Sequence, residues 1–246
     1  MSSTPPDLSG DVLRHQRLIV AGGIALLAAL AWWFLIDGAG ADSGGVMAGM
    51  SEPPFAAALL MWWLMMAAMM LPSAAPAILL YARVRHMRGG DNAIAQTWVF
   101  LAGYLALWLL FSLVAATAER LLTGPSMIVA NGTARGALLV AAGVYQLSPL
   151  KSACLGECRS PAQFISRQWR PGWMGALRLG LLHGAYCIGC CWALMLLLFV
   201  GGVMNLLWVL ALAGIVAAEK LVPQGLWLGR MVGIGLIAWG ATIVLG

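Results

Sequence analysis

The chain has 246 residues, of which 62% are hydrophobic and only 9% are charged. A water-soluble domain carries about 25% charged residues, so this composition excludes an ordinary soluble protein and predicts an all-α, polytopic transmembrane helical bundle. The formal net charge of +5 does not indicate nucleic acid, because basic residues of membrane proteins gather in cytoplasmic loops.

The predicted helices follow from the length of each apolar segment, since a hydrocarbon core of about 30 Å needs about 20 helical residues. About seven helices are expected, at residues 18–36, 55–81, 93–118, 136–150, 179–200, 204–218 and 226–245. Together residues 18–246 form one predicted transmembrane domain, and residues 1–17 a mobile cytoplasmic tail. The sequence Ala39-Gly40-Ala41 resembles a signal-peptide cleavage site, but the apolar run before it is longer than the usual 7–15 residues, which favours an uncleaved helix.

The basic residues predict the orientation. With the N-terminus in the cytoplasm, all fourteen lysines and arginines except Arg120 and Arg135 lie on the cytoplasmic side. Omitting the short fourth helix would move Lys151 and the next four arginines across the membrane, so this helix is retained. We therefore expect a multi-pass inner-membrane protein with a cytoplasmic N-terminus and a periplasmic or extracellular C-terminus. Glu219 and Lys220 end the sixth helix and are interpreted as interfacial charges, the alternative being that Glu219 is a metal ligand or accepts a hydrogen bond from one.

Two local features are predicted inside these helices. Pro72 and Pro76 fall near the end of the second helix, where proline should kink or loosen it. Gly201-Gly202 and Asn205 interrupt the uncharged run of residues 179–218 and should supply the turn between the fifth and sixth helices.

The fifth helix carries the unusual sequence HGAYCIGCCWALM. At about 100° per residue, His183, Cys187 and Cys190 fall within about 60° on one face, with Cys191 about 40° further round. Glycines 180 and 184 run beside this face, which indicates packing against another helix. A thiolate is costly inside a membrane unless a cation neutralises it, and thiolates select soft metals. The candidate metal ligands are His183, Cys187, Cys190, Cys191, Cys154 and Cys158.

The second helix contributes a methionine-rich stretch, MWWLMMAAMML. Met61, Met65 and Met69 lie within about 80° on one face, while Met66 and Met70 lie on an adjoining one. Packing is the default role of methionine, and the alternative is a thioether ladder for Cu(I). At a rise of 1.5 Å per residue, Met69 and Cys187 reach similar depths in the membrane from opposite faces. If their helices are neighbours, this predicts a line of sulfur ligands from Met47 and Met50 outside, through Met61, Met65 and Met69, to the fifth-helix cysteines and finally Cys154 and Cys158.

Three blocks of the sequence resemble a known family: MWWLMMAAMMLPSAAP, YQLSPLKSACLGECRSP and the long run from GLLHGAYCIGCCWALM to AAEKL. The resemblance covers roughly residues 56–221 and is to a bacterial family of unknown function, described as predicted metal-binding integral membrane proteins. It implies a polytopic membrane fold and metal binding at the same cysteines and histidine, with the second-helix methionines as an extension.

We therefore expect a membrane metal-handling protein that takes Cu(I) in preference to Zn, as a permease or as a membrane chaperone. Its expected partners are the lipid bilayer, the metal ion, and a metallochaperone or a metalloenzyme under assembly. The alternatives are a thiol–disulfide oxidoreductase that uses the Cys187/Cys190 CxxC pair, and a structural subunit whose cysteines only pack. No catalytic residues are assigned, because the sequence contains neither a GxSxG motif nor a phosphate-binding loop. The oligomeric state stays open.

Overall fold

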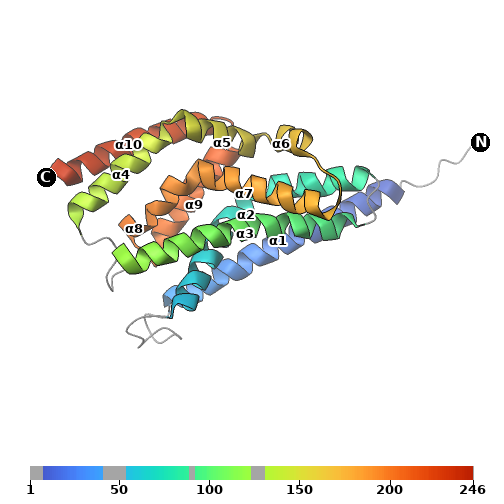
Figure 1. The fold of residues 1–246 in the computed structure, drawn as a ribbon, viewed down its shortest axis with the longest axis horizontal. Coiled ribbons are helices and arrows are strands. Elements are labelled where there is room, and N and C mark those ends of the chain that lie inside the picture. The colour runs from blue at the N-terminus through green and yellow to red at the C-terminus, as the bar shows by residue number, and fades with distance from the viewer. Residues whose placement is uncertain (1–7, 41–53, 89–91, 123–130, 246) are drawn as a thin grey trace, which may run out of the picture.

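The computed structural model describes residues 8–40, 54–88, 92–122 and 131–245, and this part of the chain is helical throughout, with no strand. The helices are α1 (Leu8–Gly40), α2 (Phe55–Met87), α3 (Ala93–Leu122), α4 (Gly132–Gln146), α5 (Pro149–Arg159), α6 (Pro161–Gln168), α7 (Gly172–Leu196), α8 (Leu198–Gly201), α9 (Leu206–Leu221) and α10 (Gly225–Leu245). Most long helices run along the long axis of the molecule, with α4 and α10 paired along one edge (Figure 1).

The seven predicted segments correspond to α1, α2, α3, α4, α7, α9 and α10. Within the part of the chain that the structure describes, five spans are long and apolar enough to cross a membrane, and a sixth arises if α4 and α5, which are bent by 62°, count as one. Helix α9 has 16 residues, about 24 Å of helix, which is shorter than a usual crossing. Seven crossings therefore stay a prediction. Helix α1 begins at Leu8, inside the segment expected to be a tail.

The end of the predicted fourth helix is wrong. Helix α4 ends at Gln146, and a new helix, α5, starts at Pro149 after the bend. The side chain of Ser148 caps α5 by accepting a hydrogen bond from the Lys151 backbone N–H (3.1 Å), and proline suits the first helical position. The bend lays α5 against α7, and this contact places the two α5 cysteines beside the predicted site.

Helices α3 and α7 cross at very close range. A Cβ atom at Gly180 would lie 2.0 Å from the carbonyl oxygen of Phe100, and one at Gly103 would lie 2.6 Å from that of Leu177. Glycine leaves room for the two backbones to touch, as small residues do between membrane helices. The prediction that the Gly180/Gly184 side of this helix packs against a neighbour is confirmed.

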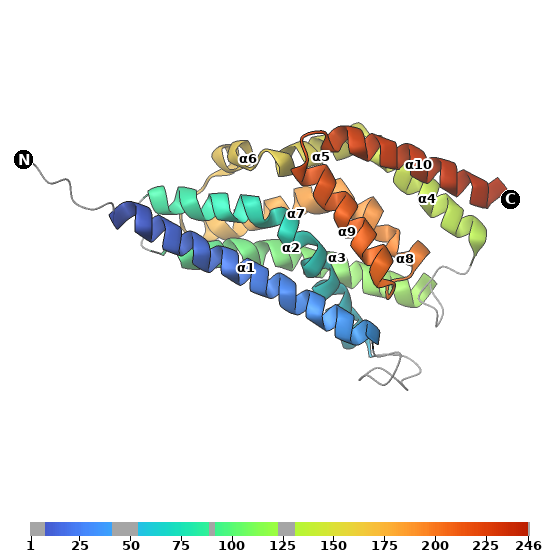
Figure 2. The same cartoon turned by 180° about the vertical axis from the view of Figure 1, so that it is seen from behind.

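Helix α2 continues through both of its prolines but changes direction part-way along (Figure 2). Pro72 has no N–H to donate to the carbonyl oxygen of Ala68, four residues earlier. That carbonyl accepts a hydrogen bond from the Trp32 indole of α1 instead, at 3.2 Å. A neighbouring helix thus satisfies the backbone group that the proline frees.

The predicted turn between α7 and α9 is confirmed. Gly202 has a φ of +91°, a conformation that favours glycine, and it follows the short helix α8. Asn205 then caps α9, because its side-chain oxygen accepts a hydrogen bond from the Trp208 backbone N–H at 3.2 Å. The turn reverses the chain and brings α9 back along the bundle.

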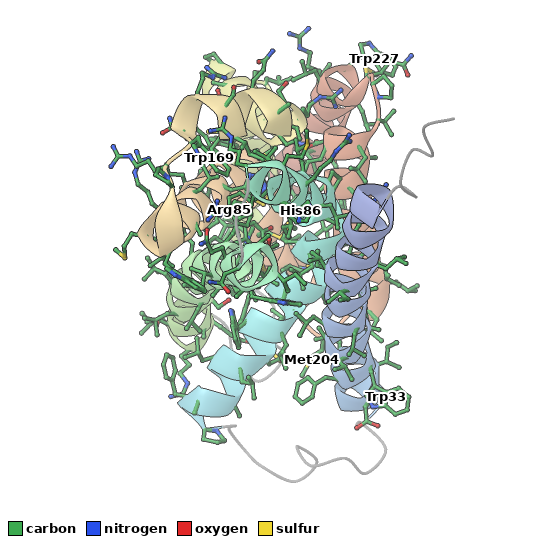
Figure 3. All side chains as sticks on the ribbon, turned by 90° about the vertical axis from the view of Figure 1, so that its right-hand side faces the viewer. Trp33, Arg85, His86, Trp169, Met204 and Trp227 are labelled. Atoms are coloured by element: carbon green, nitrogen blue, oxygen red, sulfur yellow. The ribbon has the colours of Figure 1, made fainter. Side chains whose placement is uncertain are left out.

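Basic residues mark the two ends of the bundle. At one end, the Arg88 guanidinium after α2 lies 4.7 Å from the centre of the Trp169 ring before α7. At the other end, Arg120 of α3 lies 5.0 Å from the centre of the Phe55 ring, where α2 begins. Figure 3, which looks along the bundle from one end, labels Trp169 at its upper left and Trp33 at its lower right. The orientation of these two ends relative to a membrane stays a prediction.

Candidate functional site

The predicted sulfur-bearing face of α7 points into the protein. His183, Cys187, Cys190 and Cys191 are all at most 3% exposed. The close crossing with α3 explains this burial, since it turns the same side of α7 toward the centre of the bundle. All five cysteines are free thiols.

Cys187 is the centre of a polar cluster formed by three helices. Its Sγ lies 2.9 Å from Nζ of Lys220 on α9 and 3.1 Å from the hydroxyl of Tyr104 on α3. Its backbone carbonyl accepts hydrogen bonds from the thiols of Cys190 (3.1 Å) and Cys191 (3.0 Å). The ammonium group beside Cys187 supplies the positive charge that a buried thiolate requires.

Helix α2 reaches this cluster through Met70. The Cys191 Sγ and the Lys220 Nζ each lie 3.9 Å from the Met70 Sδ, and Lys220 also donates to the Ser73 hydroxyl at 3.3 Å. We refer to the sulfur atoms of Met70, Cys187 and Cys191 as the inner sulfur cluster.

The predicted methionine ladder differs from this arrangement. Met61, Met65 and Met69 are buried on α2, but the sulfur contact between α2 and α7 is made by Met70, which the helical spacing placed on the adjoining face. Met47 and Met50 lie outside the described residues. The structure thus brings one methionine to the thiols, and the continuous line of sulfur ligands stays a prediction.

The interpretation of Glu219 and Lys220 as interfacial charges is wrong. They are 1% and 8% exposed, and Lys151, which the topology assigned to a cytoplasmic loop, is 2% exposed. Glu219 forms an ion pair with Lys151 (2.6 Å) and accepts from the Gln146 amide (2.7 Å), and Lys151 also donates to Gln146. Buried charges need such partners, because each loses its hydration on burial.

Helix α5 brings the two remaining cysteines against α7. The Cys154 sulfur lies 2.8 Å from the point where a Cβ atom of Gly189 would stand, so it touches the α7 backbone. Cys158 lies one turn further along α5. Both α5 cysteines are half-buried. At the end of α5, Arg159 donates to the carbonyl oxygens of Glu219 (2.5 Å) and Val222 (2.7 Å) and so holds the end of α9 in place.

His183 lies in an aromatic cage rather than among the thiols. Its ring centre is 6.0 Å from that of Phe100, 5.6 Å from that of Tyr104 and 5.5 Å from that of Phe164. Within the described residues its Nδ1 has no hydrogen-bond partner, although it is buried. Such an unpaired buried nitrogen is costly and is therefore a candidate for binding a ligand.

The six predicted His and Cys ligands do not form one metal site. Among the residues that the structure describes, no three His, Cys, Asp or Glu side chains converge closely enough to hold an ion. The donors divide instead into the inner sulfur cluster with Cys190 beside it, the two α5 cysteines and the caged His183. This division disfavours zinc, which takes four ligands in structural sites, and suits a soft ion that accepts thiolate and thioether sulfur.

Comparison with known proteins bears directly on the metal. A model of the PpoB2 family, described as "Copper chaperone", matches residues 59–243. The chain belongs to this family. No curated protein and no solved structure matches it. Membership of the PpoB2 family supports copper as the metal, in agreement with the metal-binding resemblance seen in the sequence.

Three residues of this PpoB2-family site were not recognised from the sequence. Tyr104 and Ser73 carry ordinary hydroxyl groups inside apolar helices, and nothing in their spacing points to Cys187 or Lys220. For Lys220 the sequence offered one indication. A lysine directly after a glutamate at the end of an apolar helix is costly to bury, so burial of both would require polar partners elsewhere in the bundle. Adjacent residues point about 100° apart on a helix, so Glu219 and Lys220 can enter two different polar clusters.

Proposed function

We propose that this PpoB2-family protein is a membrane-embedded chaperone that binds Cu(I) in the inner sulfur cluster. The observation that carries the proposal is the 3.9 Å approach of the Cys191 Sγ to the Met70 Sδ, beside the buried Cys187 thiol. Residues from α2 and α7 meet there through soft sulfur donors. Thiolate and thioether sulfur together select Cu(I) over harder ions.

The surroundings of the cluster suit reversible binding. The Lys220 ammonium already lies against Cys187, at 2.9 Å. A Cu(I) ion bound to the same sulfur would be a second positive charge at short range, and the two cations repel each other strongly where the dielectric constant is low. Copper therefore competes with Lys220, and this competition keeps the ion exchangeable. Exchange with a metallochaperone or a metalloenzyme under assembly is what a chaperone requires.

The surface supports a position within a lipid bilayer. Large apolar side chains are exposed on several helices, including Trp33 (73%), Val114 (63%) and Leu207 (80%). Apolar surface of this extent is unfavourable in water. Because the described residues include five apolar spans long enough to cross a bilayer, lipid is the environment that fits this surface best. We place the end of α2 that carries Arg88 at the cytoplasmic face.

The family description favours a chaperone over a permease. It gives no support to a thiol–disulfide oxidoreductase, and the Cys190 thiol donates to the Cys187 carbonyl.

The test is a Cu(I) titration of the purified full-length protein in detergent, under reducing and anaerobic conditions, against a chromophoric Cu(I) chelator. Met70→Leu keeps the volume of the side chain and removes the thioether, so we expect the affinity to fall at least about tenfold, or 1.4 kcal/mol. Met66→Leu, at another fully buried α2 methionine, is the matched control and should bind like the wild type. Equal affinities for the two variants would contradict the proposed site.

A further inference from the structure

The last two turns of α2 and the short helix α6 border a cavity that lies apart from the inner sulfur cluster. Figure 2 shows α6 at the edge of the bundle, next to this end of α2. The cavity has a volume of about 180 Å³. Helix α2 lines it with Leu80, Val84 and Arg88, and α6 lines it with Ala162, Ile165 and Ser166. Because Ala162 and Ser166 are exposed, the cavity can be reached from the surface of the protein.

The cavity is apolar at one end and cationic at the other. Leu80 lies eight residues before Arg88, so the α2 wall runs about 12 Å from a hydrocarbon side chain to a guanidinium group. Leu80 belongs to the apolar part of α2, whereas Arg88 directly follows its last helical residue. A dry apolar cavity of about 150 Å³ holds a benzene molecule, so this cavity has room for a hydrocarbon segment.

The guanidinium at the polar end is held by an aromatic ring. Arg88 lies over Trp169, which also lines the cavity, with 4.7 Å between the guanidinium carbon and the ring centre. None of the described carboxylates forms an ion pair with Arg88. A guanidinium held against a ring by its face keeps the N–H groups around its edge for other partners, and this edge matches the oxygens of a phosphate group.

The surface around the cavity is basic. Residues 82–88 and 161–171 contain five arginines and neither aspartate nor glutamate. Arg85 is engaged inside the protein, because it donates a hydrogen bond to the Gln96 side-chain oxygen at 2.7 Å. Arg88 lines the cavity itself. The site therefore attracts a ligand that carries negative charge at its outer end.

We propose that this cavity binds one anionic phospholipid, with its phosphate on Arg88 and the upper part of one acyl chain between α2 and α6. A lipid fits better than a soluble anion, because the hydrocarbon walls below the guanidinium favour an apolar occupant. The direction also fits, since a leaflet lipid places its phosphate outward, where α2 changes from apolar to basic residues. The inference rests on the membrane position proposed above and is independent of copper.

A lipid in this cavity would connect α6 to α2. Helix α6 has only eight residues and buries Phe164 and Ile165. The centre of the Phe164 ring lies 5.5 Å from that of His183, so α6 forms one wall of the aromatic cage. A ligand that binds only the folded protein stabilises it, and the bound lipid therefore raises the melting temperature.

The experiment titrates the delipidated full-length protein in detergent with phosphatidylglycerol and counts the bound molecules by native mass spectrometry. Phosphatidylcholine with the same acyl chains and inorganic phosphate are the two comparison ligands. The wild type should bind one phosphatidylglycerol at least about tenfold more tightly than phosphatidylcholine, because only the anionic lipid keeps its net charge beside Arg88. Phosphatidylglycerol should raise the melting temperature, and inorganic phosphate should not.

Three variants locate the site. Arg88→Gln removes the cation that lines the cavity and should weaken phosphatidylglycerol binding about tenfold. Arg83→Gln is the matched control, since it removes an exposed arginine of the same helix that lies outside the cavity lining, and it should bind like the wild type. Ala162→Phe fills the cavity from an exposed position and should remove the tight binding while every charge is kept. Ser166→Phe fills it from the next turn of α6 and should do the same.

The possible results separate a built site from general attraction. Equal losses in Arg88→Gln and Arg83→Gln would overturn the site, since the attraction would then be diffuse. Wild-type binding by both phenylalanine variants would show that the cavity is not used. Equal affinity for the two lipids, or equal stabilisation by inorganic phosphate, would exclude an anionic phospholipid as the specific ligand.

The Cu(I) titration reports separately on the proposed function. Arg88→Gln should bind Cu(I) like the wild type, because Arg88 lies outside the inner sulfur cluster. A wild type that binds copper but shows no preference for phosphatidylglycerol overturns this inference alone. A wild type that binds phosphatidylglycerol but no Cu(I) refutes the copper chaperone and leaves the lipid site in place.

Discussion

Replacing Gly180 by alanine should separate α3 from α7 and disturb the site at a distance. The added Cβ would lie 2.0 Å from the Phe100 carbonyl oxygen, and real Cβ atoms keep at least 3.0 Å. The obstacle is backbone, so no side-chain rotation can relieve it. Helix α7 must therefore move by about 1 Å. Such a shift would lengthen the 3.1 Å contact between Tyr104 and Cys187 to about 4 Å, beyond hydrogen-bonding range.

The magnitude follows from two opposing effects. Alanine favours a helix over glycine by up to about 1 kcal/mol. Overpacking of a tight contact costs about 1–3 kcal/mol, and a backbone clash belongs at the upper end of that range. Gly214 on α9 is the matched control, since a Cβ there would meet nothing within 4 Å. Both variants gain the helix preference, so their free energies of unfolding should differ by the overpacking cost alone, about 2–3 kcal/mol.

The assay is the apparent melting temperature of both variants in the same detergent, together with the Cu(I) titration. For a chain of this length the expected difference corresponds to roughly 4–12 °C. Gly214→Ala should melt at or above the wild-type temperature and bind copper normally. Gly180→Ala should melt lower and bind copper more weakly. Equal melting temperatures for the two variants would refute the close crossing of α3 and α7 as the basis of the site.

Two further predictions concern the buried charges and the orientation. Lys151→Met leaves the Glu219 carboxylate buried without its ion-pair partner, so we expect a loss of about 3–5 kcal/mol in stability, seen as a lower melting temperature. The double variant Lys151→Met with Glu219→Leu should recover most of it, and a single variant that melts like the wild type would contradict the argument. Reporter fusions at the end of α2 and at the end of α10 should report opposite compartments, and agreement between them would exclude the proposed topology.

Helical periodicity was sufficient to predict which face of α7 is buried. The spacing of His183, Cys187 and Cys190 places them on one side of any helix, and the glycines beside them fit a close crossing. The turn at Gly202 and Asn205 could also be predicted from the sequence, because these residue types favour the backbone conformations found there. These features depend on the local sequence alone, and the structure has them where they were predicted.

The partners of that face depended on contacts between distant segments. Met70 and Met69 are neighbours with the same chemistry, and only the rotation of α2 against the helices beside it decides which of them meets Cys191. The bend after α4 likewise could not be read from composition, although it determines that α5 lies on α7.

The sequence by itself determined that the chain is helical, that its surface must be largely apolar, and that His183 and three cysteines share one side of α7; a soft-metal site there stays a prediction. These properties follow from composition and from the geometry of a single helix. Only the tertiary structure decided that Lys220 and Tyr104 meet Cys187, and that Lys151 pairs with Glu219 inside the protein. The physical reason is that a charge at the end of an apolar helix can either reach water or be buried against a partner. Which of these is lower in free energy depends on which helices pack beside it.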